Sequence, residues 1–85
     1  MPKARKGSVQ IRFEILEYLY YNPGPQLKTH IWRKATTLSY DDFQKHITYL
    51  IRKGLLTEDE NSNIIITIDG KDIYLRLRSA LPSIL

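Results

Sequence analysis

The chain has 85 residues, of which 42% are hydrophobic and 26% are charged, and it contains no cysteine. This length allows one domain with a small core, and the composition is that of a folded chain rather than a disordered one. The absence of cysteine excludes a disulfide framework, thiolate metal ligands and cysteine nucleophiles. Because so small a domain needs most of its apolar residues for its core, a large catalytic cleft is not expected.

The first helix is predicted to be capped by Ser8 and to run to about Tyr21, before the turn-forming residues 22–25. Four apolar residues at helical spacing fall on one face: Val9, Phe13, Leu16 and Tyr20. A second stripe is formed by Ile11, Ile15 and Tyr18. A helix with two apolar sides needs two partners. One is the core of the domain, and the other is either the C-terminal segment or a second subunit.

A short second helix is predicted over residues 28–35, followed by a tight connection at residues 36–38. Ser39 suits the N-cap of a third helix over residues 39–53, and Asp42 three residues later resembles a capping box. The buried face expected for this helix comprises Tyr40, Phe43, Ile47, Leu50 and Ile51. Gly54 occupies the position where glycine commonly ends a helix.

After Gly54 the apolar period changes from about 3.6 to about 2, which indicates strands. Residues 55–57 and 64–68 are predicted to form a hairpin with a polar tip at residues 59–63. A last helix should start at about Lys71 and direct Ile73, Leu77 and Leu81 inward, until Pro82 ends or kinks it. This order predicts a mainly α fold with a two-stranded β-hairpin (α+β), a winged helix-turn-helix.

The charge is concentrated at the N-terminus. Thirteen basic residues exceed nine acidic ones, and the formal net charge is +4. Lys3, Arg5 and Lys6 lie in the first seven residues, which leaves residues 8–85 with ten basic against nine acidic side chains. We expect a basic arm at residues 1–7, the domain at residues 8–81 and a tail at residues 82–85. Since no segment has the apolar run of a signal peptide or a membrane span, a soluble cytoplasmic protein is expected.

Several short motifs occur together: Lys28-Thr29-His30-Ile31, Leu38-Ser39-Tyr40, Tyr49-Leu50, Lys53-Gly54-Leu55, and Ile66-Thr67 followed by Gly70-Lys71. In this order they resemble a family of small archaeal winged helix-turn-helix proteins. The family includes ArnR-like transcription regulators and a ten-kilodalton dimeric chromatin-associated protein. The resemblance covers about residues 8–77. It implies a DNA-binding, commonly dimeric protein without enzymatic activity, associated with the nucleoid when bound.

Two features depart from this pattern. The wing carries Glu58, Asp59 and Glu60, whereas a wing that contacts phosphates would favour basic residues. The last helix is too short for the coiled coil of the chromatin-type relative. The short helix argues against that mode of dimerisation. The acidic wing and the nearly neutral body fit an alternative function as a winged-helix protein–protein interaction module without specific DNA binding.

If the third helix enters the major groove, the face opposite Phe43 and Ile47 would read the bases. That face comprises Asp41, Lys45, Thr48, Tyr49 and Arg52, with Gln44 on its flank and Ser39 at its start. Lys45 and Arg52 suit guanine or phosphate, and Gln44 suits adenine. An ordinary solvated helix face explains each residue alone equally well.

Phosphate contacts are predicted from three further places: Lys28, Thr29, Arg33 and Lys34 of the second helix, Asn61, Ser62 and Asn63 of the wing tip, and Lys3, Arg5 and Lys6 of the arm. The wing-tip residues are better explained as turn formers. No metal or cofactor is expected, because His30 and His46 are 16 residues apart with no further ligand at suitable spacing. An enzyme is the least supported class, since Thr36, Thr37 and Ser39 have no histidine base nearby.

A homodimer is predicted from the first and last helices, through Ile11, Ile15, Tyr18, Leu81, Ile84 and Leu85. In the competing arrangement, the C-terminal segment folds back onto Ile11 and Ile15 of the same subunit.

Overall fold

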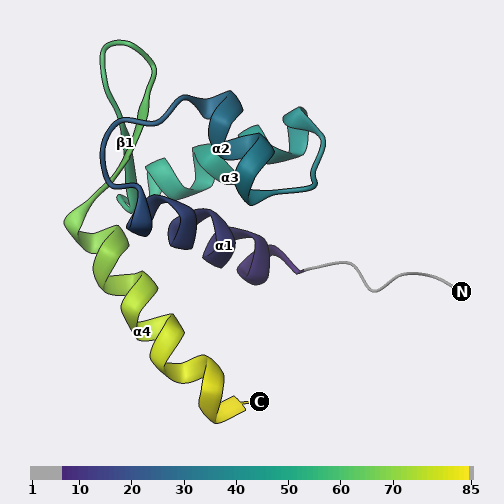
Figure 1. Ribbon diagram of the computed structural model, residues 1–85, viewed down its shortest axis with the longest axis vertical. Coiled ribbons are helices and arrows are strands. Elements are labelled where there is room, and N and C mark those ends of the chain that lie inside the picture. The colour runs from purple at the N-terminus through teal and green to yellow at the C-terminus, as the bar shows by residue number, and fades with distance from the viewer. Residues whose placement is uncertain (1–6, 85) are drawn as a thin grey trace, which may run out of the picture.

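The computed structural model describes residues 7–84, with side chains as far as residue 80. Four helices and a hairpin follow one another along the chain (Figure 1): α1 (Ser8–Tyr21), α2 (Lys28–Ala35), α3 (Tyr40–Arg52), β1 (Leu56–Glu58), β2 (Ile64–Ile66) and α4 (Ile68–Ile84). The predicted α+β fold with a helix-turn-helix and a wing is therefore confirmed. Lys3, Arg5 and Lys6 of the predicted arm lie outside the described residues.

The two ends of α3 are fixed by local interactions. The Ser39 hydroxyl accepts a hydrogen bond from the Asp42 backbone N–H at 3.3 Å, which confirms the predicted N-cap. At the other end Gly54 has a φ of +78°, a left-handed conformation that favours glycine. α1 differs from its prediction because Gly7 occupies the N-cap position and Ser8 is already helical.

The turn between α2 and α3 is held by Trp32. Its indole N–H donates to the carbonyl oxygen of Leu38 at 2.7 Å, and its ring meets Tyr40 edge-on with centroids 5.3 Å apart. Thr36 closes the end of α2, where its hydroxyl donates to the Trp32 carbonyl oxygen at 2.8 Å. Trp32 therefore sets the direction in which α3 leaves α2.

The wing is a short antiparallel hairpin in which Leu56 pairs with Ile66 and Glu58 with Ile64. Gln26, before α2, forms an isolated bridge with Ile64 on the other edge of β2, which the sequence did not predict. β2 ends at Ile66 rather than at residue 68. The reason is that the Thr67 hydroxyl accepts the backbone N–H of Gly70 at 3.0 Å, as a helix N-cap does, so α4 begins at Ile68 instead of Lys71.

The core draws on every element. The buried apolar residues are Phe13, Ile15, Leu16, Leu19, Ile31, Phe43, Ile47, Leu50, Leu56, Ile64, Ile66 and Tyr74. α1 packs against α2, α3, α4 and β2, so its second partner belongs to the same chain. Ile15 is consequently fully buried within one subunit, as the competing arrangement expects, and it has no surface left for the predicted dimer interface. Val9 is 68% exposed instead of buried, because it lies in the first turn of α1.

The docking of α4 on α1 depends on Tyr74, which is fully buried, whereas the predicted Ile73 and Leu77 are only half-buried. The Tyr74 ring packs 5.2 Å from Phe13 and 4.8 Å from Tyr20. Its hydroxyl donates to Glu17 at 3.0 Å. Burial, followed by this hydrogen bond, raises the pKa of Tyr74.

Both ends of α4 have further structural features. Near its start, a Cβ on Gly70 would collide with the carbonyl oxygen of Leu55 and lie 2.8 Å from Cγ1 of Ile66. Glycine therefore permits the close approach of α4 to the wing. At its end, α4 continues through Pro82 to Ile84, so Pro82 does not end the helix.

Candidate nucleic-acid interface

The face of α3 that points away from the core is exposed. Phe43, Ile47 and Leu50 are buried on the inner side, whereas the outer side presents Asp41, Asp42, Lys45, Thr48 and Arg52. Gln44 and Tyr49, on the two flanks of this face, are half-buried. The Lys45 ammonium lies 3.8 Å from the Asp42 carboxylate, but its side chain is 80% exposed. Such a pair is weak, so Lys45 is available to a ligand.

A basic residue of α1 joins one flank of this face. The guanidinium carbon of Arg12 lies 3.6 Å from the centroid of the Tyr49 ring, and Arg12 Nε donates to Nδ1 of His46 at 3.2 Å. Lys53 Nζ lies 5.5 Å from the same ring centroid. We refer to Arg12, His46, Tyr49 and Lys53 as the Arg12 cluster. Because 34 residues separate Arg12 from His46, local sequence patterns gave no signal for this contact.

Within the Arg12 cluster, His46 is a hydrogen-bond acceptor. Burial lowers the pKa of His46 from its ordinary value of 6.5, the positive charge of Arg12 lowers it further, and the Asp42 carboxylate acts in the opposite direction. His46 is therefore neutral at neutral pH, which the hydrogen bond from Arg12 requires.

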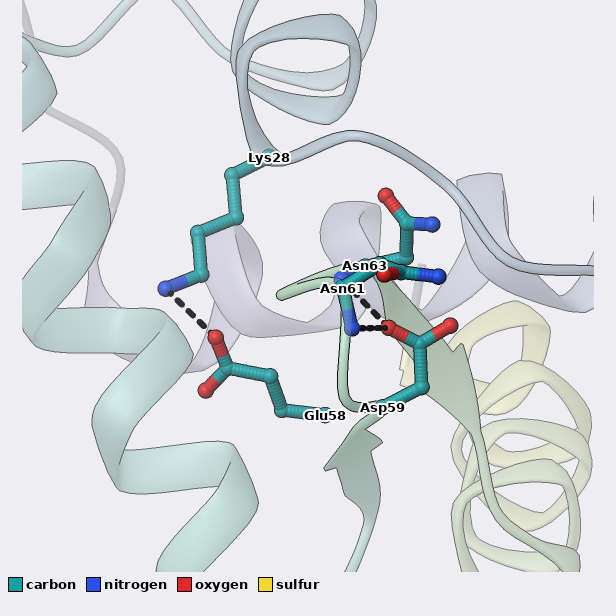
Figure 2. Close-up of polar contacts among 5 residues, drawn as sticks. All are labelled: Lys28, Glu58, Asp59, Asn61 and Asn63. Atoms are coloured by element: carbon teal, nitrogen blue, oxygen red, sulfur yellow. Dashed lines mark hydrogen bonds and ion pairs between the residues drawn. The ribbon is translucent and has the colours of Figure 1, made fainter.

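The predicted basic residues of α2 fall in two places. Thr29 and Arg33 are exposed. Lys28 is partly covered, and its ammonium forms an ion pair with the Glu58 carboxylate of the wing at 3.1 Å, beside α3 (Figure 2). Lys34 instead lines an open hollow of about 440 Å³ between α1 and α2, together with Glu14 and Glu17. Lys34 is itself exposed.

The wing tip is organised by Asp59. Its Oδ1 accepts the backbone N–H groups of Asn61 and Asn63, both at 2.9 Å (Figure 2). Ser62 adopts a left-handed φ of 65° in the same turn. Two of the three wing acids thus have local roles, since Glu58 pairs with Lys28 and Asp59 holds the turn. Glu60 is exposed.

Two further properties concern residues 7–84. This part of the chain holds no group of three or more His, Cys, Asp or Glu residues arranged to bind a metal ion. None of its helices is long and apolar enough to cross a bilayer.

Comparison with protein families matches residues 5–82 to a family described as winged helix-turn-helix. Comparisons with curated proteins and with solved structures found no significant match.

Proposed function

The chain belongs to the winged helix-turn-helix family, and from this premise we propose that it is a non-enzymatic protein that binds double-stranded DNA with α3 in the major groove. The observation that carries the proposal is the outer face of α3. Lys45, Thr48 and Arg52 are exposed there on a helix whose opposite side is locked in the core. Ser39 and Trp32 fix the start of that helix, so its outer face is presented in one orientation.

In this proposal the basic residues divide by task. Lys45 and Arg52 contact guanine or phosphate, and Gln44 contacts adenine. Thr29 and Arg33 of α2, with the arm residues Lys3, Arg5 and Lys6, neutralise phosphates. Lys28 contacts a phosphate only when its ion pair with Glu58 opens. Lys34 is exposed as well and lines the hollow between α1 and α2, so its phosphate contact stays a prediction. Asn61, Ser62 and Asn63 serve first as turn residues, and Asn61 and Ser62 stay exposed beside the phosphates.

The narrower role follows the resemblance of the sequence motifs. We infer a transcription regulator or a small chromatin-associated protein of the archaeal type, in the cytoplasm and on the nucleoid when bound. The two roles differ in sequence preference. A regulator binds its operator about 10³-fold or more tightly than mixed DNA, whereas a chromatin protein discriminates far less.

We also infer a homodimer through α4. The C-terminal end of α4 extends beyond α1 (Figure 1), and Leu75, near the middle of α4, is 40% exposed. Ile11 and Tyr18 of α1 remain half-buried, whereas Ile15 is fully enclosed and takes no part. Leu81, Ile84 and Leu85 complete the predicted interface, although their side chains lie outside the described part of the chain. Two-fold pairing would place two copies of α3 on one side of the duplex, about one helical turn or a multiple apart.

Sedimentation tests the dimer. The chain has a mass of 10.0 kDa, so a homodimer has twice that mass. The Leu75→Glu variant should sediment as a 10.0 kDa monomer and keep the helical content of the wild type. A wild-type monomer at a concentration of about 100 µM would remove the basis for two-fold operators.

A mobility-shift assay on mixed-sequence duplex DNA at two salt concentrations tests DNA binding. Binding is expected at low salt and should weaken steeply as salt rises. The double variant Lys45→Ala/Arg52→Ala should bind more weakly than wild type. The matched control is Arg76→Ala/Arg78→Ala, which removes the same charge from exposed positions of α4. A folded wild-type chain that does not bind at low salt would refute the proposal and favour the protein-interaction module.

A further inference from the structure

We propose that Arg12 of α1 is a DNA phosphate-binding residue outside the helix-turn-helix, and that Tyr49 and His46 hold it in place rather than reading bases themselves. The inference rests on the proposed DNA binding and adds to it a site that neither the sequence motifs nor the family match indicates. It also changes the role of Tyr49, which the sequence placed among the base-reading residues.

The side chain of Arg12 is fixed at two points. Its guanidinium stacks on the Tyr49 ring at 3.6 Å from the centroid, and its Nε is engaged by Nδ1 of His46 at 3.2 Å. A stacked guanidinium with one engaged nitrogen has lost most of its rotational freedom before any ligand arrives. Arg12 therefore loses less conformational entropy on binding an anion than a free surface arginine does.

The rest of the Arg12 guanidinium is free to donate. The hydrogen bond to His46 uses only Nε, so the two Nη groups keep their donors. The ion pairs found among the described residues involve Lys28, Lys45 and Arg76, and none of them neutralises Arg12. Its partner His46 is neutral and removes no charge. A planar cation with two free Nη groups matches the geometry of phosphate oxygens.

The location of the cluster determines which anion it meets. Tyr49 lies on the flank of the outer face of α3 that packs against α1, and Lys53 places a second ammonium 5.5 Å from the same ring. A helix that lies in the major groove has a phosphate backbone along each flank. With α3 in the groove, Arg12 and Lys53 face the backbone strand on the α1 side, whereas Lys28, the first residue of α2, pairs with Glu58 of the wing.

The test is fluorescence anisotropy on a mixed-sequence duplex over a range of salt concentrations. Each phosphate contact contributes about 0.9 to the slope of log affinity against log salt. Arg12→Ala should therefore lower the magnitude of the slope by about 0.9 per subunit and weaken binding about eightfold at 0.1 M salt. The matched control is Arg76→Ala, which removes the same charge from α4. This helix lies on the side of α1 away from α2 and α3 (Figure 1), so the control should leave the slope unchanged.

The positioning role of Tyr49 has its own readout. Tyr49→Phe keeps the ring and should bind DNA as wild type does. Tyr49→Leu removes the stacking surface and should weaken binding, but it should cause little further loss when combined with Arg12→Ala, because both changes remove one contact. If Tyr49→Phe loses as much affinity as Tyr49→Leu, the Tyr49 hydroxyl contacts DNA directly and the positioning role is overturned.

A measurement on the wild-type chain avoids any effect of substitution on folding. The ¹⁵Nε–H resonance of Arg12 should shift on addition of the duplex, and it should not shift on addition of the same duplex at a salt concentration that prevents binding. A wild-type chain that binds DNA with an unmoved Arg12 resonance and an unchanged slope in Arg12→Ala overturns this inference alone. A wild-type chain that does not bind DNA overturns both this inference and the proposed function.

Discussion

Replacing Glu58 with glutamine tests whether the wing masks a basic residue of the interface. The Glu58 carboxylate lies 3.1 Å from the Lys28 ammonium, and the two side chains are 35% and 23% exposed. Because the pair is accessible to water, it should contribute only about 0–1 kcal/mol to folding stability, so Glu58→Gln is expected to stay folded. The change frees Lys28 at the start of α2, where it can meet a DNA phosphate.

The size of the effect follows from counting phosphate contacts. One additional contact per subunit should steepen the slope of log affinity against log salt by about 0.9. Between 50 and 200 mM salt, a fourfold change, the variant should lose about 3.5-fold more affinity than wild type does. At the lower salt concentration it should bind more tightly than wild type. Fluorescence anisotropy with a mixed-sequence duplex measures both quantities.

Glu60→Gln is the matched control, since Glu60 is exposed in the same wing and its replacement changes the net charge equally. It should raise affinity less than Glu58→Gln does and leave the slope nearly unchanged. Equal effects of the two variants would refute the reasoning, because only net charge would then matter. Weaker binding by Glu58→Gln would show that DNA binding needs the Lys28–Glu58 pair intact.

Three further predictions concern stability, measured by urea unfolding followed by circular dichroism. Tyr74→Ala should cost about 3–5 kcal/mol, and a loss below about 1 kcal/mol would contradict its place in the core. Gly70→Ala should cost about 3 kcal/mol through overpacking, whereas Gly24→Ala, with open space around it, should cost under about 1 kcal/mol. The pKa of His46 is lowered below 6.5 in the folded chain, so as the pH falls the unfolded chain binds the proton first. The contribution of neutral His46 to the free energy of unfolding is therefore fully present above about pH 6.5 and is lost as the pH falls below that value. His46→Gln should flatten this decline, and the control His30→Gln should not. If the free energy of unfolding depends on pH in the same way in both variants, His46 is not the residue that causes the decline.

The sequence predicted those elements whose signals are local. The Ser39 cap, the glycine at position 54 and the apolar spacing of α3 each depend on neighbours within one or two turns, and the structure has all three. The start of α4 was missed by three residues because Thr67 reads as a strand former. Its role as a cap appears only when its hydroxyl meets the N–H of Gly70.

Packing between distant segments explains the other errors. Helical spacing assigned Ile73 and Leu77 to the core, but Tyr74 is the buried residue because Phe13, Tyr20 and Glu17 of α1 receive its ring and hydroxyl. Periodicity reports which residues share a face, and it does not report how the helix is rotated against its neighbour. Ile15 was assigned to the dimer interface for the same reason.

The candidate site was partly predictable. The outer face of α3 follows from the helical wheel, and Asp41, Lys45, Thr48 and Arg52 are exposed on it as expected. Tyr49 and Gln44 are half-buried, and Asp42 joins the face without having been predicted there. The pairing of Lys28 with Glu58 and the stacking of Arg12 on Tyr49 join residues far apart in the chain. Neither contact has a local signature, so the sequence alone could not show that Lys28 is masked or that α1 contributes a basic residue.

Titration of the ¹⁵N-labelled chain with a DNA duplex, followed by backbone amide resonances, tests the central claim most directly. The account predicts that the resonances that shift or broaden belong to the outer face of α3, around Lys45, Thr48 and Arg52, and to the adjoining starts of α2 and the wing. Those of α4 beyond Tyr74 should not respond. Changes confined to α4 or to the hollow between α1 and α2, with the α3 resonances unmoved, would contradict the account.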